Sequence, residues 1–195
     1  MTLLVLGSAS PRRARLLSQL GVPFEVRSSD VAEDLIPGES ARDHATRLAR
    51  DKALAVSASE ADAFVLGSDT VVSVDEEILG KPVDAADARR MLLRLSGKTH
   101  RVLTAVALVG PGGAVRREVC EESLVRFRKL AAAEIDRYVA GGEPLDKAGA
   151  YAIQGGAADF VARLQGSYEN VVGLPLDEVR VLLEQEGLYP PRLGR

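Results

Sequence analysis

Residues 3–17 read LLVLGSASPRRARLL, and this stretch indicates the type of fold. An apolar strand candidate leads through a short loop into an apolar helical pattern that resumes after Pro11. Ser10 is a favourable helix N-cap, and Pro11 suits the first helical position because its missing N–H is not needed there. Arg12 and Arg13 follow at the positive end of the helix dipole, where a cation is unfavourable without a bound anion. The stretch therefore predicts a strand–loop–helix unit whose loop can hold an anion.

Strand and helix patterns alternate along the rest of the chain. We expect strands over 24–27, 64–67, 71–74, 99–109 and 114–127, and helices over 40–57, 84–96, 132–140 and after Pro175. The two long strands are joined by GPGG, which predicts a hairpin. Alternating strands and helices with one inserted hairpin predict an α/β protein with a mixed sheet. Because no repeat or linker is visible, we expect a single domain over residues 1–195, with a frayed tail over 189–195.

Composition and charge argue against several classes of protein. The 195 residues are 46% hydrophobic and 27% charged, as in ordinary globular proteins, and no apolar run approaches membrane-spanning length. The net charge of −3 argues against a general nucleic-acid binder, because affinity for the phosphate backbone needs surplus Lys and Arg. Cys120 is the only cysteine and the two histidines are far apart, which excludes an internal disulfide and argues against a zinc site. With no signal-peptide pattern, we expect a cytoplasmic protein without nucleic-acid or membrane partners.

Two familiar motifs fail. Residues 97–99 read GKT like the end of a phosphate-binding P-loop, but that motif needs a glycine where this chain has Leu92. The motif also needs a strand before it and a helix after it, whereas this GKT follows a helical pattern and precedes a strand pattern. No G-x-S-x-G occurs, so the nucleophile elbow of an α/β-hydrolase is absent. A P-loop NTPase or kinase and an α/β-hydrolase are therefore excluded.

Charged residues beside turns are the remaining candidates, and each has a structural alternative. The start of a helix together with Arg12 and Arg13 can bind a phosphate, although a solvated helix start would show the same residues. Asp69, which follows an apolar strand, is either a turn cap or a metal ligand or general base. Lys52 can reach a ligand or extend along its helix to solvent, and Lys81 is either a ligand or a hairpin-tip residue.

Two further segments are ambiguous when taken alone. The stretch DKAGAYAIQGG holds Tyr151 and Gln154, and its closely spaced glycines either allow the backbone to approach a flat ligand or form a plain loop. Glu33 lies in an acidic loop over 28–39 and indicates nothing by itself. Taken singly, none of these residues identifies a reaction.

Taken in order, several segments resemble the Maf family of nucleoside triphosphate pyrophosphatases. The matching segments are LGSASPRRARLL, RLARDKA, LGSDTVV, LGKP, LSGKTHRVLTAVAL, EPLDKAGAYAIQG and GSYENVVGLPL, together with the loop around Glu33. The resemblance covers nearly the whole chain, from Leu3 to about Leu183. It implies an α/β fold with an elongated twisted mixed β-sheet, flanking helices and two lobes around a cleft, similar to Maf and ITPase-like nucleotide hydrolases. It also implies hydrolysis of a nucleoside triphosphate to the monophosphate and pyrophosphate with a divalent metal, Mg²⁺, Mn²⁺ or Co²⁺.

The resemblance implies roles for individual residues. Asp69 is the expected catalytic base, and Glu33 is expected to help it hold the metal. Lys52 and Lys81 complete the expected catalytic set. Binding of the substrate is expected from Ser8, Ser10, Arg12, Arg13, Thr70 and Gln154. A highly charged triphosphate needs cationic groups of this kind, and the amide of Gln154 can both donate to and accept from a pyrimidine.

Substrate choice is where alternatives stay open. The stretch DKAGAYAIQG is similar to the branch of the family that acts on dTTP and UTP, whereas the branch acting on 7-methyl-GTP lacks it. CTP and modified pyrimidine nucleotides are alternative substrates, as in an enzyme that cleans the nucleotide pool, with a link to cell-division arrest. A non-catalytic nucleotide-binding regulator of septum formation is a further alternative, and it would show no metal-dependent turnover. The resemblance also implies a homodimer.

Overall fold

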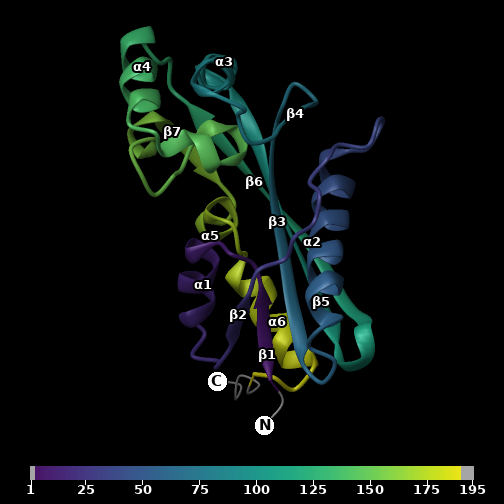
Figure 1. Cartoon of the computed structure of the whole chain (residues 1–195). Coiled ribbons are helices and arrows are strands. Elements are labelled where there is room, and N and C mark those ends of the chain that lie inside the picture. The colour runs from purple at the N-terminus through teal and green to yellow at the C-terminus, as the bar shows by residue number, and fades with distance from the viewer. Residues whose placement is uncertain (1–2, 190–195) are drawn as a thin grey trace. The chain divides into compact units, whose positions relative to one another are not determined.

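The structure of the protein is a computed structural model that describes residues 3–189, in which strands and helices alternate (Figure 1). The strands are β1 (Leu4–Gly7), β2 (Glu25–Arg27), β3 (Phe64–Val74), β4 (Glu77–Leu79), β5 (Thr99–Gly110), β6 (Ala114–Phe127) and β7 (Val161–Gln165). The α-helices are α1 (Pro11–Ser18), α2 (Ala41–Ser57), α3 (Ala85–Leu95), α4 (Ala132–Ala140), α5 (Tyr168–Val172) and α6 (Leu176–Gln185). Short 3₁₀ turns are η1 (Pro111–Gly113), η2 (Glu143–Asp146), η3 (Ala148–Ala150) and η4 (Ala158–Phe160).

The strands of the described chain form one mixed sheet, which confirms the predicted α/β class. Their order is β2-β1-β3-β5-β6-β7, and β4 pairs with β3 outside this path. β1 is parallel to both β2 and β3, whereas β4 is antiparallel to β3 and β7 is antiparallel to β6. The hairpin predicted at GPGG is present, because β5 and β6 are neighbours joined by Pro111–Gly113. No helix within residues 3–189 has both the length and the apolar character needed to cross a membrane.

The chain divides into two compact units. Of the described residues, the first unit contains 3–69, 104–121 and 173–189, and the second contains 70–103 and 122–172. The single-domain organisation and the cleft between two lobes stay predictions. Apart from Tyr189, the tail predicted to fray over 189–195 lies outside the described residues.

Helix starts follow the capping residues that the sequence indicates. The side chains of Ser10, Ser40 and Asp84 each accept a hydrogen bond from the backbone N–H three residues later, at the starts of α1, α2 and α3. Such a side chain satisfies an N–H group that the first helical turn cannot pair internally. The N-cap predicted at Ser10 is therefore confirmed, and Ser40 and Asp84 cap the helices expected over 40–57 and 84–96 in the same way.

In the first unit, the backbone of α2 lies close against β3. A Cβ added at Gly67 would lie 2.2 Å from the carbonyl oxygen of Ala49 and 2.7 Å from the backbone nitrogen of Ala53. Figure 1 shows α2 running alongside β3. The missing side chain at Gly67 therefore lets α2 approach β3 closely enough to bring Lys52 next to Asp69. Fully buried apolar side chains of the unit include Leu4, Leu6, Leu17, Leu48, Leu66 and Leu108.

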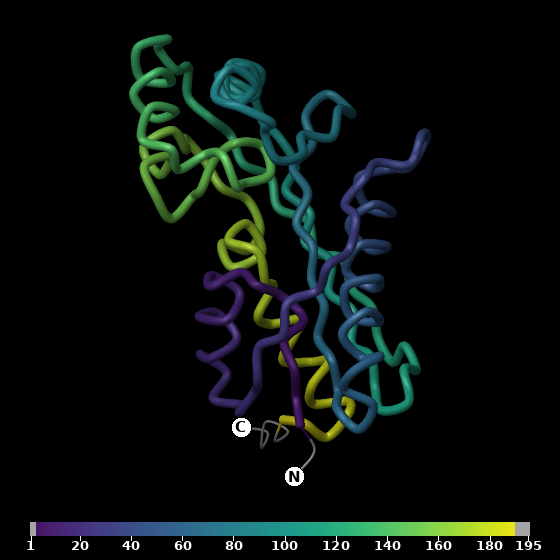
Figure 2. Tube along the Cα trace, in the orientation of Figure 1, coloured from purple at the N-terminus to yellow at the C-terminus, as the bar shows by residue number. Residues whose placement is uncertain are grey.

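In the second unit, α3 packs against α4, and both can be followed along the trace in Figure 2. A buried aromatic cluster forms part of the core: the ring of Phe127 lies 4.9 Å from that of His100 and 4.9 Å from that of Tyr151, both edge to face. The Nε2 atom of His100 is hydrogen-bonded to the Tyr151 hydroxyl at 2.8 Å. Burial lowers the pKa of His100 to about 4, so this imidazole is neutral at physiological pH.

Four features differ from the sequence-based expectations. Strands over 64–67 and 71–74 were expected to flank Asp69, which is wrong because β3 continues through Phe64–Val74. A buried carboxylate is tolerated within the strand because Lys52 pairs with it. β4, β7 and α5 are also absent from the expected elements, because each is short and its segment carries no clear strand or helix period.

Candidate active site

An ammonium group held between two carboxylates is the chemical centre of the first unit. The Nζ atom of Lys52 lies 2.6 Å from Asp69 Oδ1 and 2.6 Å from Glu33 Oε1. Lys52 and Asp69 are buried, whereas the Glu33 side chain keeps 37% of its surface exposed. Three residues from a helix, a strand and a loop are thus brought together, and their catalytic roles stay predictions.

Asp69 owes its place to the register of the parallel strands. Gly7, the last residue of β1, is paired with Gly67 of β3. Asp69 therefore lies two residues beyond the carboxyl end of β1, on the strand face that it shares with Gly67, which is the face toward α2. Ligands in open α/β sheets bind at the carboxyl ends of strands, so this position suits a functional carboxylate.

The loop between β1 and α1 is fixed by hydrogen bonds to its serines and to a distant carbonyl. Ser8 Oγ, which is buried, accepts from the backbone N–H of Ser10 at 3.2 Å and from Arg13 Nη1 at 3.2 Å. Arg13 Nε donates to the carbonyl oxygen of Gly173 at 2.9 Å, and Ser68 Oγ donates to the same oxygen at 3.3 Å. The guanidinium of Arg13 is therefore held in place from two sides.

Arg12 and Arg13 differ in their surroundings. Burial lowers the pKa of Arg13 from its ordinary value, Asp69 and Glu33 raise it, and the positive charge of Arg12 lowers it. Arg13 stays charged, because guanidinium groups do not lose their proton in proteins. Within residues 3–189, the guanidinium of Arg12 has no hydrogen bond or ion pair to another residue. A partly buried cation without a protein partner is free to bind an anion, which resolves the unfavourable placement at the helix start.

The loop that carries Glu33 is attached to α2 by a second charged cluster. Arg47 donates to both carboxylate oxygens of Glu39, at 2.7 and 2.9 Å, and its Nη2 also donates to the carbonyl oxygen of Asp34 at 3.0 Å. Glu39 Oε2 also lies 2.9 Å from Nδ1 of the buried His44. The hydrogen bonds from Arg47 lower the pKa of Glu39 to about 2. This cluster fixes the backbone next to Glu33, a role that sequence reasoning missed.

The remaining predicted residues belong to the second unit. Thr70 follows Asp69 directly in β3, Lys81 is exposed after β4, and Gln154 is exposed in the glycine-rich segment. The backbone N–H of Gly149 donates to the carbonyl oxygen of Gly80 at 3.0 Å, which joins the segment of Gln154 to that of Lys81. Gly149 has a φ of 67°, and a Cβ there would lie 2.8 Å from Val72, so this contact requires glycine.

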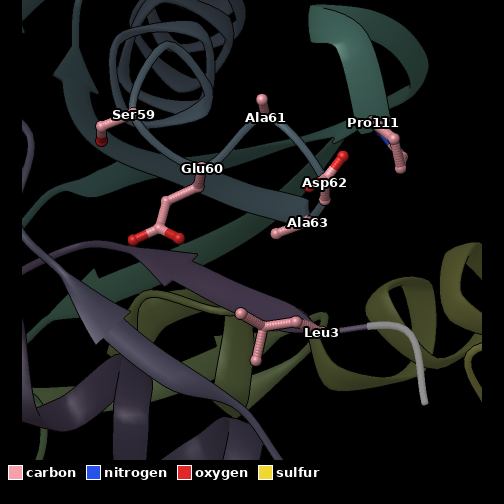
Figure 3. A pocket seen from close by; sticks show the side chains of 7 residues that line it. All are labelled: Leu3, Ser59, Glu60, Ala61, Asp62, Ala63 and Pro111. Atoms are coloured by element: carbon pink, nitrogen blue, oxygen red, sulfur yellow. The ribbon is translucent and has the colours of Figure 1, made fainter.

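A hollow in the surface of the first unit does not coincide with these residues. It is lined by Leu3, Ser59, Glu60, Ala61, Asp62, Ala63 and Pro111 (Figure 3). Leu3 and Ala63 precede β1 and β3, so the hollow lies at the amino ends of these two strands, whereas Asp69 lies further along β3. It contains none of the predicted site residues.

A divalent cation would find two candidate ligands here, Glu33 and Asp69. Within the described residues, no three His, Cys, Asp or Glu side chains converge as a ready-made metal site. Mg²⁺ needs no such cage, since it is commonly held by one or two carboxylates together with substrate phosphates and water. Glu33 and Asp69, held close together by Lys52, could therefore bind a cation whose other ligands are the phosphates of the substrate and water.

Some residues of the site carried no readable sequence signal. Gly173 acts through its backbone carbonyl, and Ser68 was seen only as a neighbour of Asp69. The signal for Arg47 was faint: it lies in the segment RLARDKA, five residues before Lys52.

Comparisons with known proteins agree with this reading. A family model described as "Maf-like protein" matches residues 3–186. A dTTP/UTP pyrophosphatase of Hahella chejuensis is 50% identical over 188 residues, covering 95% of this chain and 92% of the relative. A dTTP/UTP pyrophosphatase of Geobacter sulfurreducens is 54% identical over 178 residues, covering 90% of this chain and 92% of the relative. The structure of a HAM1 protein from Coxiella burnetii has a similar fold, with a TM-score of 0.50 and 14% identity over 95% of this chain and all (100%) of the other. Because the family model matches nearly the whole length of this chain, the chain belongs to the Maf family.

Proposed function

We propose that this protein hydrolyses nucleoside triphosphates, dTTP and UTP foremost, to the nucleoside monophosphate and pyrophosphate. The observation that carries the proposal is the ammonium of Lys52 between Asp69 and Glu33, beside the helix start that carries Arg12 and Arg13. The names of relatives at 50% and 54% identity support the same reaction and substrates. CTP and modified pyrimidine nucleotides are further candidate substrates.

The loop after β1 is proposed to bind the phosphates. Arg12 offers a guanidinium without a protein partner among the described residues, and hydrogen bonds of this charged kind contribute about 1.5–3 kcal/mol each. Arg13, held by Gly173 and Ser8, keeps its positively charged guanidinium in a fixed orientation beside this loop. Ser10 and the first N–H groups of α1 add to the same positive site. Lys81 is proposed as a further phosphate ligand from the second unit.

Asp69 is proposed to accept the proton from the attacking water. A general base must be oriented, and the hydrogen bond from Lys52 fixes one of the Asp69 carboxylate oxygens and leaves the other for water. Glu33 is held through the same ammonium, so Lys52 sets the separation of the two carboxylates. The chain thereby supplies Asp69 as the base, Glu33 as a second positioned carboxylate, and cations for the leaving pyrophosphate.

Glu33 and Asp69 would also hold the divalent cation, for which Mg²⁺, Mn²⁺ and Co²⁺ are the candidates. When bound, such a cation offsets negative charge that develops on the phosphate oxygens during displacement. Gln154 and Thr70 are proposed to recognise the base, because an amide can match both a donor and an acceptor on the edge of a pyrimidine.

The decisive test is pyrophosphate release by the Asp69→Asn variant. Loss of a positioned acid–base group lowers turnover by about 10²–10⁴-fold, while binding of the nucleotide is retained. Release is measured across canonical and modified triphosphates with and without each metal, and binding is measured by calorimetry. Turnover close to wild type in this variant would remove Asp69 from the mechanism, and equal rates on all bases would refute the pyrimidine preference.

The alternative of a non-catalytic nucleotide-binding regulator of septum formation is less favoured. The relatives of this chain carry the names of enzymes. The expected base Asp69 and the expected lysines and arginines are all present in the sequence. The alternative predicts nucleotide binding without metal-dependent release of pyrophosphate in the same assay. The homodimer and the cytoplasmic location stay predictions, and sedimentation of the purified protein tests the first.

A further inference from the structure

Gln154 lies at the tip of a tight turn with a buried neighbour. The backbone N–H of Gly155 donates to the carbonyl oxygen of Ala152 at 3.0 Å, which closes a four-residue turn. Of its two central residues, Ile153 is only 8% exposed, whereas Gln154 is exposed. The turn is thus anchored inward by one side chain and presents the amide of the next.

Two side chains outside the proposed catalytic machinery hold both ends of this turn. At one end, the N–H of Ala152 donates to the Tyr138 hydroxyl at 3.1 Å. At the other end, the N–H of Gly156 donates to Glu143 Oε2 at 3.1 Å. The Tyr138 hydroxyl in turn donates to Glu143 Oε1 at 3.0 Å, so one hydrogen-bonded pair connects the two ends.

The surroundings of the Tyr138–Glu143 pair keep it in position. The Tyr138 ring, on α4, packs edge to face on Phe160 with ring centroids 5.3 Å apart. Burial raises the pKa of Tyr138, so its hydroxyl keeps the proton that it donates to Glu143. A Cβ at Gly155 would lie 2.0 Å from Glu143 Oε1, which means that this glycine allows the carboxylate to lie against the turn.

We propose that Tyr138 and Glu143 are positioning residues that hold Gln154 in the orientation needed to select the pyrimidine base, an inference that rests on the proposed role of Gln154. Neither residue needs to touch the nucleotide. A short exposed turn between glycines would otherwise sample many backbone conformations, and the bound base would have to order it at a cost in affinity. Because Tyr138 and Glu143 already hold both ends of the turn, a pyrimidine that pairs with Gln154 does not have to order it.

The test is a double-mutant cycle on base selectivity. Tyr138→Phe removes the hydroxyl and both of its hydrogen bonds while it keeps the ring on Phe160. We expect kcat/KM for dTTP to fall about tenfold, mainly through KM, which corresponds to the net contribution of about one hydrogen bond. The kcat/KM for dGTP is expected to change less than twofold, so the preference for dTTP collapses. Glu143→Gln, which keeps one acceptor oxygen, should give a smaller loss in the same direction.

Gln154→Ala provides the background that distinguishes positioning from a general structural role. If Tyr138 acts through Gln154, Tyr138→Phe has no further effect on selectivity once Gln154 is replaced. The matched control is Tyr168→Phe, which removes the hydroxyl of an exposed tyrosine in α5 and should leave every rate unchanged. Thermal unfolding of each variant is measured alongside.

The outcomes separate the two proposals. Selectivity lost in Gln154→Ala but kept in Tyr138→Phe would overturn the positioning role and leave the proposed function standing. Equal losses for dTTP and dGTP, accompanied by a lower melting temperature, would show a structural role only and also overturn it. Selectivity unchanged in Gln154→Ala would instead refute base recognition by Gln154, and the positioning role would fall with it.

Discussion

Replacing Lys52 by methionine removes the charge between two carboxylates while nearly keeping the shape of the side chain. In the wild-type protein, the ammonium lies 2.6 Å from oxygens of both Asp69 and Glu33. Lys52→Met leaves these carboxylates without the ammonium between them, and Arg13 is then the remaining cation that acts on both. We expect the variant to lose both stability and catalytic activity, and the stability loss can be sized from the structure.

The magnitude follows from the distances and the exposure of each group. The two carboxylate oxygens can lie at most about 5 Å apart, and at an effective dielectric constant of about 20 their charges repel by about 3 kcal/mol. Removal of one partner from a buried ion pair costs about 3–5 kcal/mol. The Asp69 side chain is 11% exposed and that of Glu33 is 37% exposed, so water screens the Glu33 share. We therefore expect the free energy of unfolding to fall by about 3 kcal/mol.

Urea denaturation in metal-free buffer measures this loss, and Asp69→Asn provides the comparison. In the Asp69→Asn background, Lys52→Met should cost about 1 kcal/mol or less, because only the more exposed Glu33 then loses its contact with the ammonium. Added Mg²⁺ should raise the unfolding midpoint of Lys52→Met more than that of the wild type, since no ammonium competes for the two carboxylates.

A cost below about 1 kcal/mol in the wild-type background would contradict the predicted electrostatic contribution of Lys52. The same cost with and without the Asp69 charge would contradict it as well, because the loss would then come from packing alone. Leu48→Ala, in the same helix and fully buried, is the control for packing, and its cost should be the same in both backgrounds.

Three further predictions concern single residues. Arg12→Met should raise KM for the triphosphate about tenfold or more and leave the urea midpoint nearly unchanged. Arg13→Met should lower both the affinity for the triphosphate and the stability of the fold. Steady-state kinetics and urea unfolding measure these effects. Because Arg47 lowers the pKa of Glu39 from 4.5 to about 2, this carboxylate contributes stability above pH about 4.5 that is lost as pH falls toward 2; Glu39→Gln should lack that loss in urea unfolding at stepped pH. Burial lowers the pKa of His100 from 6.5 to about 4, so the unfolded chain takes up a proton before the folded protein does as the pH falls. The free energy of unfolding should therefore fall by about 3 kcal/mol from pH 6.5 to 4. His100→Phe should lack this pH dependence.

Local signals in the sequence were enough to place five of the six α-helices of the described chain. The helices that begin after Ser10, Ser40 and Asp84 start at a capping side chain, and capping depends on residues within one turn. β7 could not be found this way, since its five residues form a strand only by pairing with β6. The start of α5 did carry a signal, because Ser167 Oγ accepts from the N–H of Asn170 at 3.0 Å.

The candidate site shows the same limit more sharply. Lys52 and Asp69 are 17 positions apart in the sequence, and their contact depends on how closely α2 approaches β3. Only Gly67 hints at that approach, and a glycine in a strand has several readings. The pairing of Arg47 with Glu39 and Asp34 is likewise a tertiary contact that no spacing rule predicts. Resemblance to a family supplied the candidate residues, and the structure supplied the distances between them.

The carbonyl of Gly173 is synthesised long after the groups that bind it. It lies 160 positions after Arg13 and 105 positions after Ser68, both of which donate to it. In a growing chain, Ser8 can contact Arg13 early, but the second contact of its guanidinium waits until almost the whole polypeptide has been made. The loop after β1 is therefore completed among the last parts of the chain to assemble, although it is encoded near the first residue.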